Sequence, residues 1–364
     1  MWRGAAFSLF FTAFLGACQP YPYPYPYYAF YPNHSHDFEL EKPQKKHDGV
    51  GKEPLVYSQP EPVAKPTPIV LGDLTVNIAF DGSESLTVWR DTLDFAAENN
   101  VKFTFFIVGV HLLQDDLAEL YDPPGRRPGR SDVGFGGTKA EVQERLSLIR
   151  RAYREGHEIG GHANGHWDGS AFTYEEWMSE LDQFRTFVSQ AYELNEITNP
   201  NKKEWQELTA SIRGFRAPLL AYNDAMYDAL SDSGYLYDTS KVKTLRATEN
   251  YAHRGLTIYP LTSLMTDRGR TITMDYNFFV LDEGRLEGGG QNMLNAYRKH
   301  VAKAVSMGGA PIQIGHHFSR WNKGQYWWAL KEFIKEFCNE DEVQCITFQE
   351  RFAIEQGTLL ASLN

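Results

Sequence analysis

The sequence of 364 residues has few basic residues, few cysteines and no long hydrophobic run near its start. It contains 36 Lys and Arg residues against 47 Asp and Glu residues, which gives a formal net charge of −11. A nucleic-acid-binding protein needs a basic face, so this charge balance argues against a nucleic-acid partner. The apolar stretch at residues 5–14 is too short to span a bilayer.

Residues 1–18 are typical of an export signal, with an early arginine, an apolar segment and then Leu15-Gly16-Ala17-Cys18. The last four residues resemble the lipobox of bacterial lipoproteins. We therefore expect Cys18 to be lipidated and to anchor the protein to a membrane; an ordinary cleaved signal is the alternative. Gln19 follows the cysteine where an inner-membrane retention signal would have Asp. This favours the outer membrane or periplasm within the bacterial cell envelope.

Residues 19–68 contain repeated Tyr-Pro pairs and further prolines, a composition typical of an extended linker. The remaining residues, 69–364, can bury one core as a single domain. We expect this domain to be a monomer. Two of the three cysteines, Cys338 and Cys345, lie in it seven residues apart. An export compartment permits disulfides, so we expect these two to pair, with buried free thiols as the alternative.

Hydrophobic periodicity predicts alternating strands and helices from residue 74 onwards. The expected strands are the segment leading into His162 and residues 74–80, 101–108, 211–215, 235–237, 255–260, 271–276, 311–315 and 343–348. The expected helices are residues 86–99, 139–155, 173–192, 224–233, 292–307 and 326–337. Residues 122–137 and 193–210 are expected to be inserted loops. Repeated strand–helix units predict an α/β fold with a parallel, barrel-like sheet.

Polar residues stand at the ends of several predicted strands, where α/β barrels place their chemistry. His162 and His166 are four residues apart, and two neutral imidazoles on one face can hold a divalent metal such as zinc. The others are Asp81, Arg216, Asp238 and His316. Taken singly, an acid such as Asp81 could simply cap the following helix.

Together these positions resemble the motifs of the polysaccharide deacetylase family (the NodB homology domain, carbohydrate esterase family 4). The matching segments, in order, are Ala79-Phe80-Asp81-Gly82, His162-Ala163-Asn164-Gly165-His166, Arg216-Ala217-Pro218, Tyr237-Asp238 and Ile314-Gly315-His316. The resemblance implies a distorted (β/α) barrel of the NodB type. It also implies a metal-dependent hydrolase, with Zn²⁺ favoured over Co²⁺ or Ni²⁺, that removes N-acetyl groups from amino sugars of a polysaccharide.

The resemblance also implies a role for each residue. His162 and His166 would hold the metal, and Asp81 would be the general base. Arg216 would orient Asp81, while the backbone N–H of Leu219 would stabilise the developing oxyanion. His316 would be the general acid, with Asp238 accepting a hydrogen bond from it. We choose His316 over His317 because it shares one side of a strand with Ile312 and Ile314; a bulge in that strand would favour His317.

The sequence departs from the family at Gly82, where members usually carry a second Asp that binds the metal. Asp81 itself, Glu84, Asp168 or water could complete the metal shell instead. The favoured substrate is peptidoglycan, followed by chitin-type glycans and exopolysaccharide. A catalytically silent glycan-binding lipoprotein is the alternative function, and an esterase acting on O-acetyl groups is a third possibility.

Overall fold

The computed structural model describes residues 74–245, 251–284 and 287–357. The expected signal, the lipidation site Cys18 and the linker at residues 19–68 lie outside these residues. The described residues all belong to one compact unit. In this part of the chain no helix combines the length and apolar character needed to cross a bilayer.

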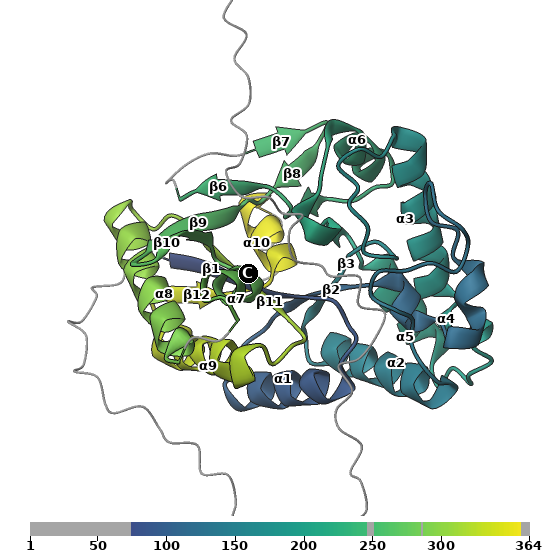
Figure 1. Cartoon of the computed structure of the whole chain (residues 1–364), viewed down its shortest axis with the longest axis horizontal. Helices are drawn as coiled ribbons and strands as arrows, with labels where there is room; N and C mark the ends of the chain where they lie inside the picture. Colours follow the sequence, from purple (N-terminus) through teal and green to yellow (C-terminus); the bar gives the residue numbers. More distant parts are fainter. Residues whose placement is uncertain (1–73, 246–250, 285–286, 358–364) are drawn as a thin grey trace, which may run out of the picture. The chain divides into compact units, whose positions relative to one another are not determined.

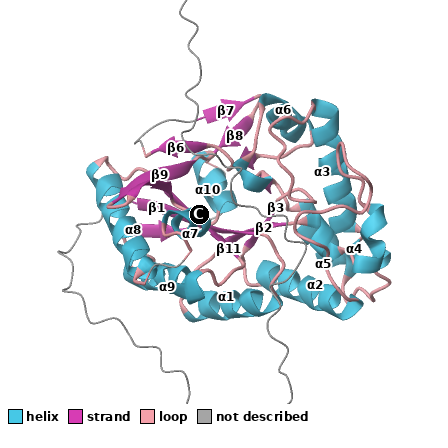
Figure 2. Cartoon of the chain, in the orientation of Figure 1, coloured by secondary structure: helices cyan, strands magenta, loops and turns pink. Residues whose placement is uncertain are grey.

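A largely parallel sheet forms the centre of the described unit (Figures 1 and 2). Its strands run in the order β11 (Ile312–His317), β1 (Leu74–Asp81), β2 (Thr104–Ile107), β3 (Glu158–Gly161), β4 (Gly214–Phe215), β5 (Tyr237–Asp238), β8 (Leu256–Ile258) and β7 (Tyr251–His253). Strand β12 (Val343–Cys345) pairs with the start of β1. Only the β7–β8 pair in this sheet is antiparallel among the described strands.

A second, smaller sheet has the order β10 (Gly269–Ile272), β9 (Leu261–Thr266) and β6 (Val242–Thr244). Met274, just after β10, forms a parallel bridge with Gly315 of β11. This bridge brings the second sheet to the free edge of the first, so the strands curl round as an incomplete barrel. The predicted α/β fold, a distorted barrel of the NodB type, is confirmed.

Helices surround the strands in the described part of the chain (Figure 2). They are α1 (Leu86–Glu98), α2 (Lys139–Arg154), α3 (Tyr174–Ser189), α4 (Ala191–Leu194), α5 (Lys202–Ala210), α6 (Asp224–Asp232), α7 (Asp275–Leu281), α8 (Gly289–Ser306), α9 (Gln325–Phe337) and α10 (Phe348–Glu355). Side-chain caps fix where several begin: the hydroxyls of Ser85, Thr138 and Thr173 each accept a backbone N–H in the first turn. Ser85, not Asp81, therefore caps α1.

Alternate residues of β1 enter two different cores. Val76, Ile78 and Phe80 pack with the surrounding helices in the largest hydrophobic cluster. Ala79 points the other way, into a small cluster inside the curled sheet that also contains Phe106, Tyr237, Tyr259 and Phe348. The face on which a strand-end residue emerges therefore decides whether it meets the helices or the barrel interior.

Several segments differ from the sequence-based expectation, among them the helix α10 and the strands β6, β7 and β9, which were not expected. Residues 193–210, expected to be a loop, include α5, because Trp205 and Leu208 are three residues apart and both are buried. Residues 271–276, expected to be a strand, divide between β10 and the first turn of α7, which begins at Asp275. After α9, Cys338 and Cys345 form a disulfide with a Cα–Cα distance of 5.4 Å.

Candidate active site

Asp81 and Arg216 form a buried ion pair inside the curled sheet. Asp81 ends β1, and Arg216 directly follows β4. A guanidinium N–H of Arg216 donates to Oδ1 of Asp81 at 2.7 Å, and the two side chains are 0% and 3% exposed. The Nε–H of Arg216 donates to Thr239 at 2.8 Å, and its guanidinium lies over the ring of Phe106. Arg216 therefore holds Asp81 in one position.

His162 and His166 lie together, with ring centroids 5.3 Å apart. Nδ1 of His162 is 2.7 Å from the carbonyl oxygen of Arg216, which can only accept a hydrogen bond. We therefore assign the proton to Nδ1, which leaves the lone pair on Nε2. Nδ1 of His166 is buried and has no hydrogen-bond partner in the described part. Burial lowers the pKa of His162 to about 4 and that of His166 well below its usual value, so both rings are neutral.

The loop that carries the two histidines is tightly held. Asn164 donates its side-chain N–H to the Glu180 carboxylate at 2.8 Å, and Gly165 donates its N–H to the hydroxyl of Tyr121 at 3.1 Å. Tyr121 in turn donates to Glu180. Ala163 and His166 both have positive φ angles, 53° and 58°. Positive φ angles are unfavourable for residues other than glycine. These contacts therefore offset the backbone strain that comes with placing the two histidines in this loop.

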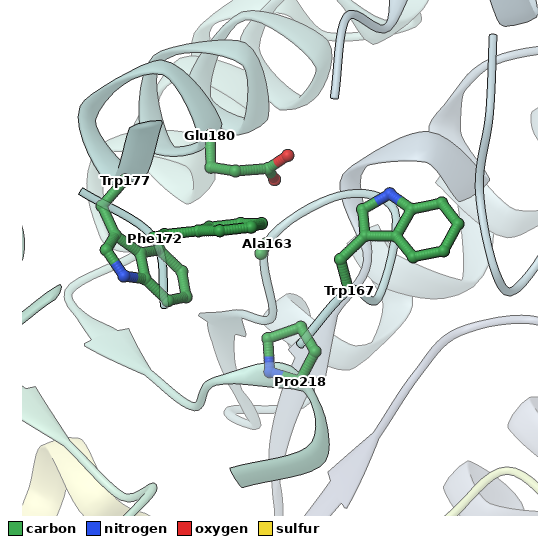
Figure 3. Close-up of a pocket in the computed structure, with 6 residues that line it drawn as sticks. All are labelled: Ala163, Trp167, Phe172, Trp177, Glu180 and Pro218. Atoms are coloured by element: carbon green, nitrogen blue, oxygen red, sulfur yellow. The ribbon is translucent and has the colours of Figure 1, made fainter. Parts of the chain in front are cut away.

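A small, mostly apolar pocket lies against this loop (Figure 3). It is lined by Ala163, Trp167, Phe172, Trp177, Glu180 and Pro218. The rings of Phe172 and Trp177 meet edge to face, with centroids 5.4 Å apart. These rings support the loop from the side of α3, where Glu180 also originates.

His317, rather than His316, lies beside Asp81. The register of β1 and β11 pairs Asp81 with His317 and Phe80 with His316. In a parallel pair, register partners emerge on the same face, so His316 shares the helix-facing side with Phe80, Ile312 and Ile314. The alternation used to choose His316 is correct, but it places that residue on the face away from Asp81.

Asp275 orients His317. Nδ1 of His317 is 2.7 Å from Oδ1 of Asp275, and the backbone N–H of His317 donates to Oδ2 at 3.0 Å. Burial alone would lower the pKa of His317, but the charge and hydrogen bond of Asp275, helped by Asp81 and Glu84, raise it above its usual value. Burial instead lowers the pKa of His316 to about 4, and its Nε2 has no partner among the described residues. Of these two rings, His317 is therefore the one whose pKa is raised and whose protonated form is favoured.

The prediction that Asp238 accepts a hydrogen bond from His316 is wrong. Tyr237 points into the barrel interior, so its neighbour Asp238 emerges on the opposite face. There the carboxylate accepts the backbone N–H of Ser240 at 2.9 Å and its hydroxyl at 2.6 Å. The Ser240 hydroxyl accepts the N–H of Ala217 at 2.7 Å. Asp238 therefore fixes the loop after Arg216, and burial raises its pKa to about 7.

Sequence reasoning missed Asp275 because residues 271–276 read as one strand. An acid followed by Phe278 at helical spacing was the available signal for a helix start. It also missed Arg145 of α2, which is buried and donates to the carbonyl oxygens of Ser83 at 2.8 Å and Glu84 at 3.1 Å. Arg145 therefore fixes the backbone of the loop that follows Asp81.

Gly82 lies in this loop with a φ of 92°. A Cβ atom at that position would stand 2.6 Å from Oε2 of Glu84, so the Glu84 carboxylate fills the space of a side chain at residue 82. The backbone N–H of Ser83 donates to the same oxygen at 3.1 Å. Glu84 as a whole residue is exposed, but its carboxyl group folds back over Gly82, and the loss of solvent there raises its pKa.

The donor chemistry of His162 and His166 fits a divalent metal, since both rings are neutral and each has a ring nitrogen to offer. The buried Nδ1 of His166 without a partner is the observation that most directly calls for one. Nowhere in the described ranges, however, do three His, Cys, Asp or Glu side chains gather closely enough to form a complete metal site. His162 and His166 therefore fit a divalent metal, but in the described part of the chain no third protein ligand completes the site with them.

The loop after Arg216 contains a second strained turn. Leu219 and Leu220 have φ angles of 57° and 55°, and both are in the left-handed region. Non-glycine residues in this region cost free energy, and such strained residues tend to cluster at active sites and ligand clamps. Leu219 is the residue whose backbone N–H was expected to face the oxyanion.

Comparisons with known proteins agree with this architecture. Residues 71–237 match the family model for polysaccharide deacetylases, a range that includes Asp81, both histidines of the pair and Arg216. No curated protein matches the sequence significantly. Among solved structures, a protein from Mycobacterium smegmatis described as a candidate polysaccharide deacetylase is 17% identical with a TM-score of 0.52; the match covers 82% of this chain and 94% of that chain.

Two further structures are less similar. A family 4 acetyl xylan esterase from Clostridium thermocellum, solved with a cobalt ion, is 15% identical with a TM-score of 0.42, over 78% of this chain and 92% of that chain. A family 4 pseudoenzyme from Bacillus anthracis is 12% identical with a TM-score of 0.38, over 73% of this chain and 60% of that chain. The part of this chain from residue 71 to residue 237 therefore matches the polysaccharide deacetylase family.

Proposed function

We propose that this protein is a metal-dependent hydrolase that removes N-acetyl groups from amino sugars of a cell-envelope polysaccharide, with peptidoglycan as the first substrate. One observation supports this function above the others. Asp81, held by Arg216, and His317, held by Asp275, are register partners on adjacent strands. A fixed carboxylate and a protonated imidazole side by side are what general base and general acid catalysis require.

The metal would be held by His162 and His166, with Zn²⁺ favoured over Co²⁺ or Ni²⁺. When bound, it would polarise the acetyl carbonyl and lower the pKa of the attacking water. The structure leaves the third ligand open, and we propose that the carboxylate of Glu84 supplies it. This carboxylate occupies the space that a side chain at Gly82 would fill.

The remaining chemistry belongs to residues of this chain. Asp81 accepts a proton from water as the water oxygen adds to the acetyl carbon. The backbone N–H of Leu219 donates to the carbonyl oxygen as negative charge develops on it. His317 then gives its proton to the sugar nitrogen, the C–N bond breaks, and acetate and a free amine are released. Arg216 and Asp275 act as positioning residues for Asp81 and His317.

The direct test is acetate release from purified peptidoglycan, chitin oligomers and exopolysaccharide, with and without a chelator. We expect release from at least one glycan, its loss with chelator, and its return when metal is added. If no glycan yields acetate that depends on metal, the proposed function is wrong.

The pH dependence of kcat should report on His317. Because Asp275 raises the pKa of this ring, the protonated acid persists above pH 6.5 and kcat should fall as pH rises through the raised value. Asp275→Asn removes the charge, so this alkaline limb should move to lower pH. Asp228→Asn is the control, since Asp228 lies 2.8 Å from His253 in a similar pair on the surface. If the alkaline limb of kcat lies at the same pH in Asp275→Asn and Asp228→Asn, the assignment of His317 as the general acid is wrong.

The interaction of Asp275 with His317 also predicts that the free energy of unfolding falls as pH rises, just as kcat does. The raised pKa of His317 contributes stability at pH values below about 6.5, and this contribution is lost as pH rises through the folded-state pKa. In Asp275→Asn, the difference in unfolding free energy between pH 6 and pH 9 should be smaller than in the parent protein. Urea unfolding at both pH values measures it.

Removing the Glu84 carboxylate should weaken metal binding. We expect Glu84→Gln to lower the affinity for Zn²⁺ by at least about tenfold, because a metal loses more from a missing ligand than from a missing neighbour of a ligand. Competition with a fluorescent zinc chelator measures this without any substrate. The matched control is Glu144→Gln, an exposed glutamate of α2 paired with Arg90. An unchanged affinity in Glu84→Gln would leave water, Asp81 or Asp168 as the third ligand.

Gly82 is the observation that favours the alternative, a catalytically silent glycan-binding protein. In that case the purified protein would hold no metal, and Asp81→Asn would change neither turnover nor glycan binding. An esterase acting on O-acetyl groups would use the same residues, and a panel of O-acetylated and N-acetylated glycans distinguishes the two.

From the sequence alone, we also propose lipidation at Cys18 and an exported, monomeric protein in the bacterial cell envelope, on the outer membrane or in the periplasm. Membrane fractionation of the full chain beside its Cys18→Ser variant tests the anchor. Recovery of both proteins in the soluble fraction would argue for an ordinary cleaved signal.

A further inference from the structure

The inserted loop at residues 122–137 places an exposed arginine beside the histidine pair. The guanidinium carbon of Arg126 lies 4.0 Å from the ring centroid of Trp167, and Trp167 directly follows His166 in the sequence. A guanidinium that lies over an aromatic face gains cation–π energy and keeps N–H groups at its edge for other partners. Arg126 remains exposed, so these N–H groups are accessible to a ligand.

Backbone hydrogen bonds fix the loop that carries Arg126. The N–H of Arg126 donates to the carbonyl oxygen of Pro123 at 3.2 Å, which closes a turn. The N–H of Asp132 donates at 2.9 Å to the carbonyl oxygen of Gly165, which lies between the two histidines in the sequence. The inserted loop and the histidine loop are therefore joined directly. A guanidinium held in this way loses little entropy when a ligand binds.

Arg126 has no counter-ion within the described ranges. One of its side-chain N–H groups donates to the carbonyl oxygen of Pro124 at 3.1 Å, and it forms no ion pair with another described residue. Two carboxyl groups, those of Asp132 and Glu180, are close enough for its charge to act on them. The Glu180 carboxylate is buried and accepts other hydrogen bonds, and Asp132 forms no ion pair among the described residues either. The positive charge of Arg126 is therefore available to an anionic ligand.

The ring beneath Arg126 belongs to the border of the proposed reaction centre. Trp167 lines the small pocket together with Ala163 and Pro218 (Figure 3). Ala163 belongs to the histidine loop, and Pro218 directly precedes Leu219, the proposed oxyanion donor. Arg126 therefore lies beside the loops that would hold the metal and the oxyanion, on the side of Trp167.

We propose that Arg126 binds a carboxylate on a sugar unit next to the one whose acetamide reacts, so that the site prefers an acidic glycan to a neutral one. A guanidinium binds a carboxylate through two parallel N–H···O bonds, which are stronger than hydrogen bonds between neutral groups. This inference rests on the proposed deacetylase function for the position of Arg126 relative to the reacting sugar. Peptidoglycan has such a carboxylate on the lactyl group of its N-acetylmuramic acid units, whereas chitin-type glycans are neutral.

The experiment compares two forms of one ligand, the peptide-free tetrasaccharide of alternating N-acetylglucosamine and N-acetylmuramic acid, with its carboxyl groups free or as methyl esters. Titration calorimetry measures the binding of each form to the metal-loaded protein. We expect the parent protein to bind the free acid about tenfold more tightly than the ester, and less so at high salt. Arg126→Gln should remove most of this difference without changing the affinity for the ester. The matched control is Arg127→Gln, an exposed neighbour that lies over no aromatic ring of the described residues.

Acetate release from both forms is recorded in parallel, so that the carboxylate site and the proposed function are tested separately. Preference for the free acid that depends on Arg126, without acetate release from any glycan, would retain the site and overturn the function. Acetate release with equal affinities of the parent protein for acid and ester would retain the function and overturn the site. Equal losses in Arg126→Gln and Arg127→Gln would also overturn the site, because the effect would then come from charge alone. Melting temperatures confirm that the compared variants are folded.

Discussion

His317→Gln is expected to lower kcat for acetate release by about 10²- to 10⁴-fold, the usual contribution of a general acid. The same change at His316 should leave kcat within about tenfold of the parent protein, because His316 lies on the helix-facing side of β11 beside Phe80. Acetate release at saturating glycan, normalised to the folded fraction by circular dichroism, measures both. The physical reason is that only His317 combines a raised pKa with a position next to Asp81.

Each of these two variants is the control for the other, because His316 and His317 are adjacent in the sequence and both lie near Asp275. His316→Gln is expected to reduce stability, because His316 is 1% exposed and packs against Phe80. A larger loss of kcat in His316→Gln than in His317→Gln would return the acid role to His316. In that case the strand register would have to differ from the one described.

Arg216→Met is expected to lower the free energy of unfolding by about 3–5 kcal/mol, the range found when one partner of a buried ion pair is removed. Both Arg216 and Asp81 are almost fully buried, so the remaining carboxylate would lose the guanidinium that compensates its charge in a site with little solvent. Urea unfolding measures the change. The matched control is Arg254→Met, which removes an exposed pair with Asp232 and should cost at most about 1 kcal/mol.

A double variant separates the charge effect from lost packing. Asp81→Asn combined with Arg216→Met removes both charges, so part of the stability lost in Arg216→Met alone should return. The double variant should not release acetate, because it lacks the carboxylate of Asp81, the proposed base. If Arg216→Met and Arg254→Met cost the same, the Asp81–Arg216 pair would not be electrostatically isolated from solvent, and the view of Asp81 as a carboxylate held by Arg216 would be wrong.

The resemblance of the sequence to one family identified the residues that gather in the site. Asp81, His162, His166 and Arg216 were predicted from five short motifs, and the structure brings the ion pair and the histidine pair together. These positions are predictable because each follows a strand, and the carboxyl ends of parallel strands meet at one edge of a sheet. The roles of the residues remain proposals.

The contacts of Asp275 and Glu84 could not be predicted from the sequence motifs. Asp275 is separated from His317 by 42 residues, and only the bridge between Met274 and Gly315 brings it alongside β11. Glu84 reaches the space beside Gly82 because that glycine has a positive φ angle and no side chain. Both contacts depend on how the chain folds back, which local periodicity does not report.

The sequence by itself determined the fold class, the order of its main strands and helices, and the residue types available for catalysis. The tertiary structure alone decided which face of each strand the polar residues occupy. His316 and His317 differ by one position, as do Tyr237 and Asp238, and one position reverses the direction of a side chain. The pairing of β1 with β11 therefore put His317 beside Asp81, and the burial of Tyr237 inside the barrel turned Asp238 away.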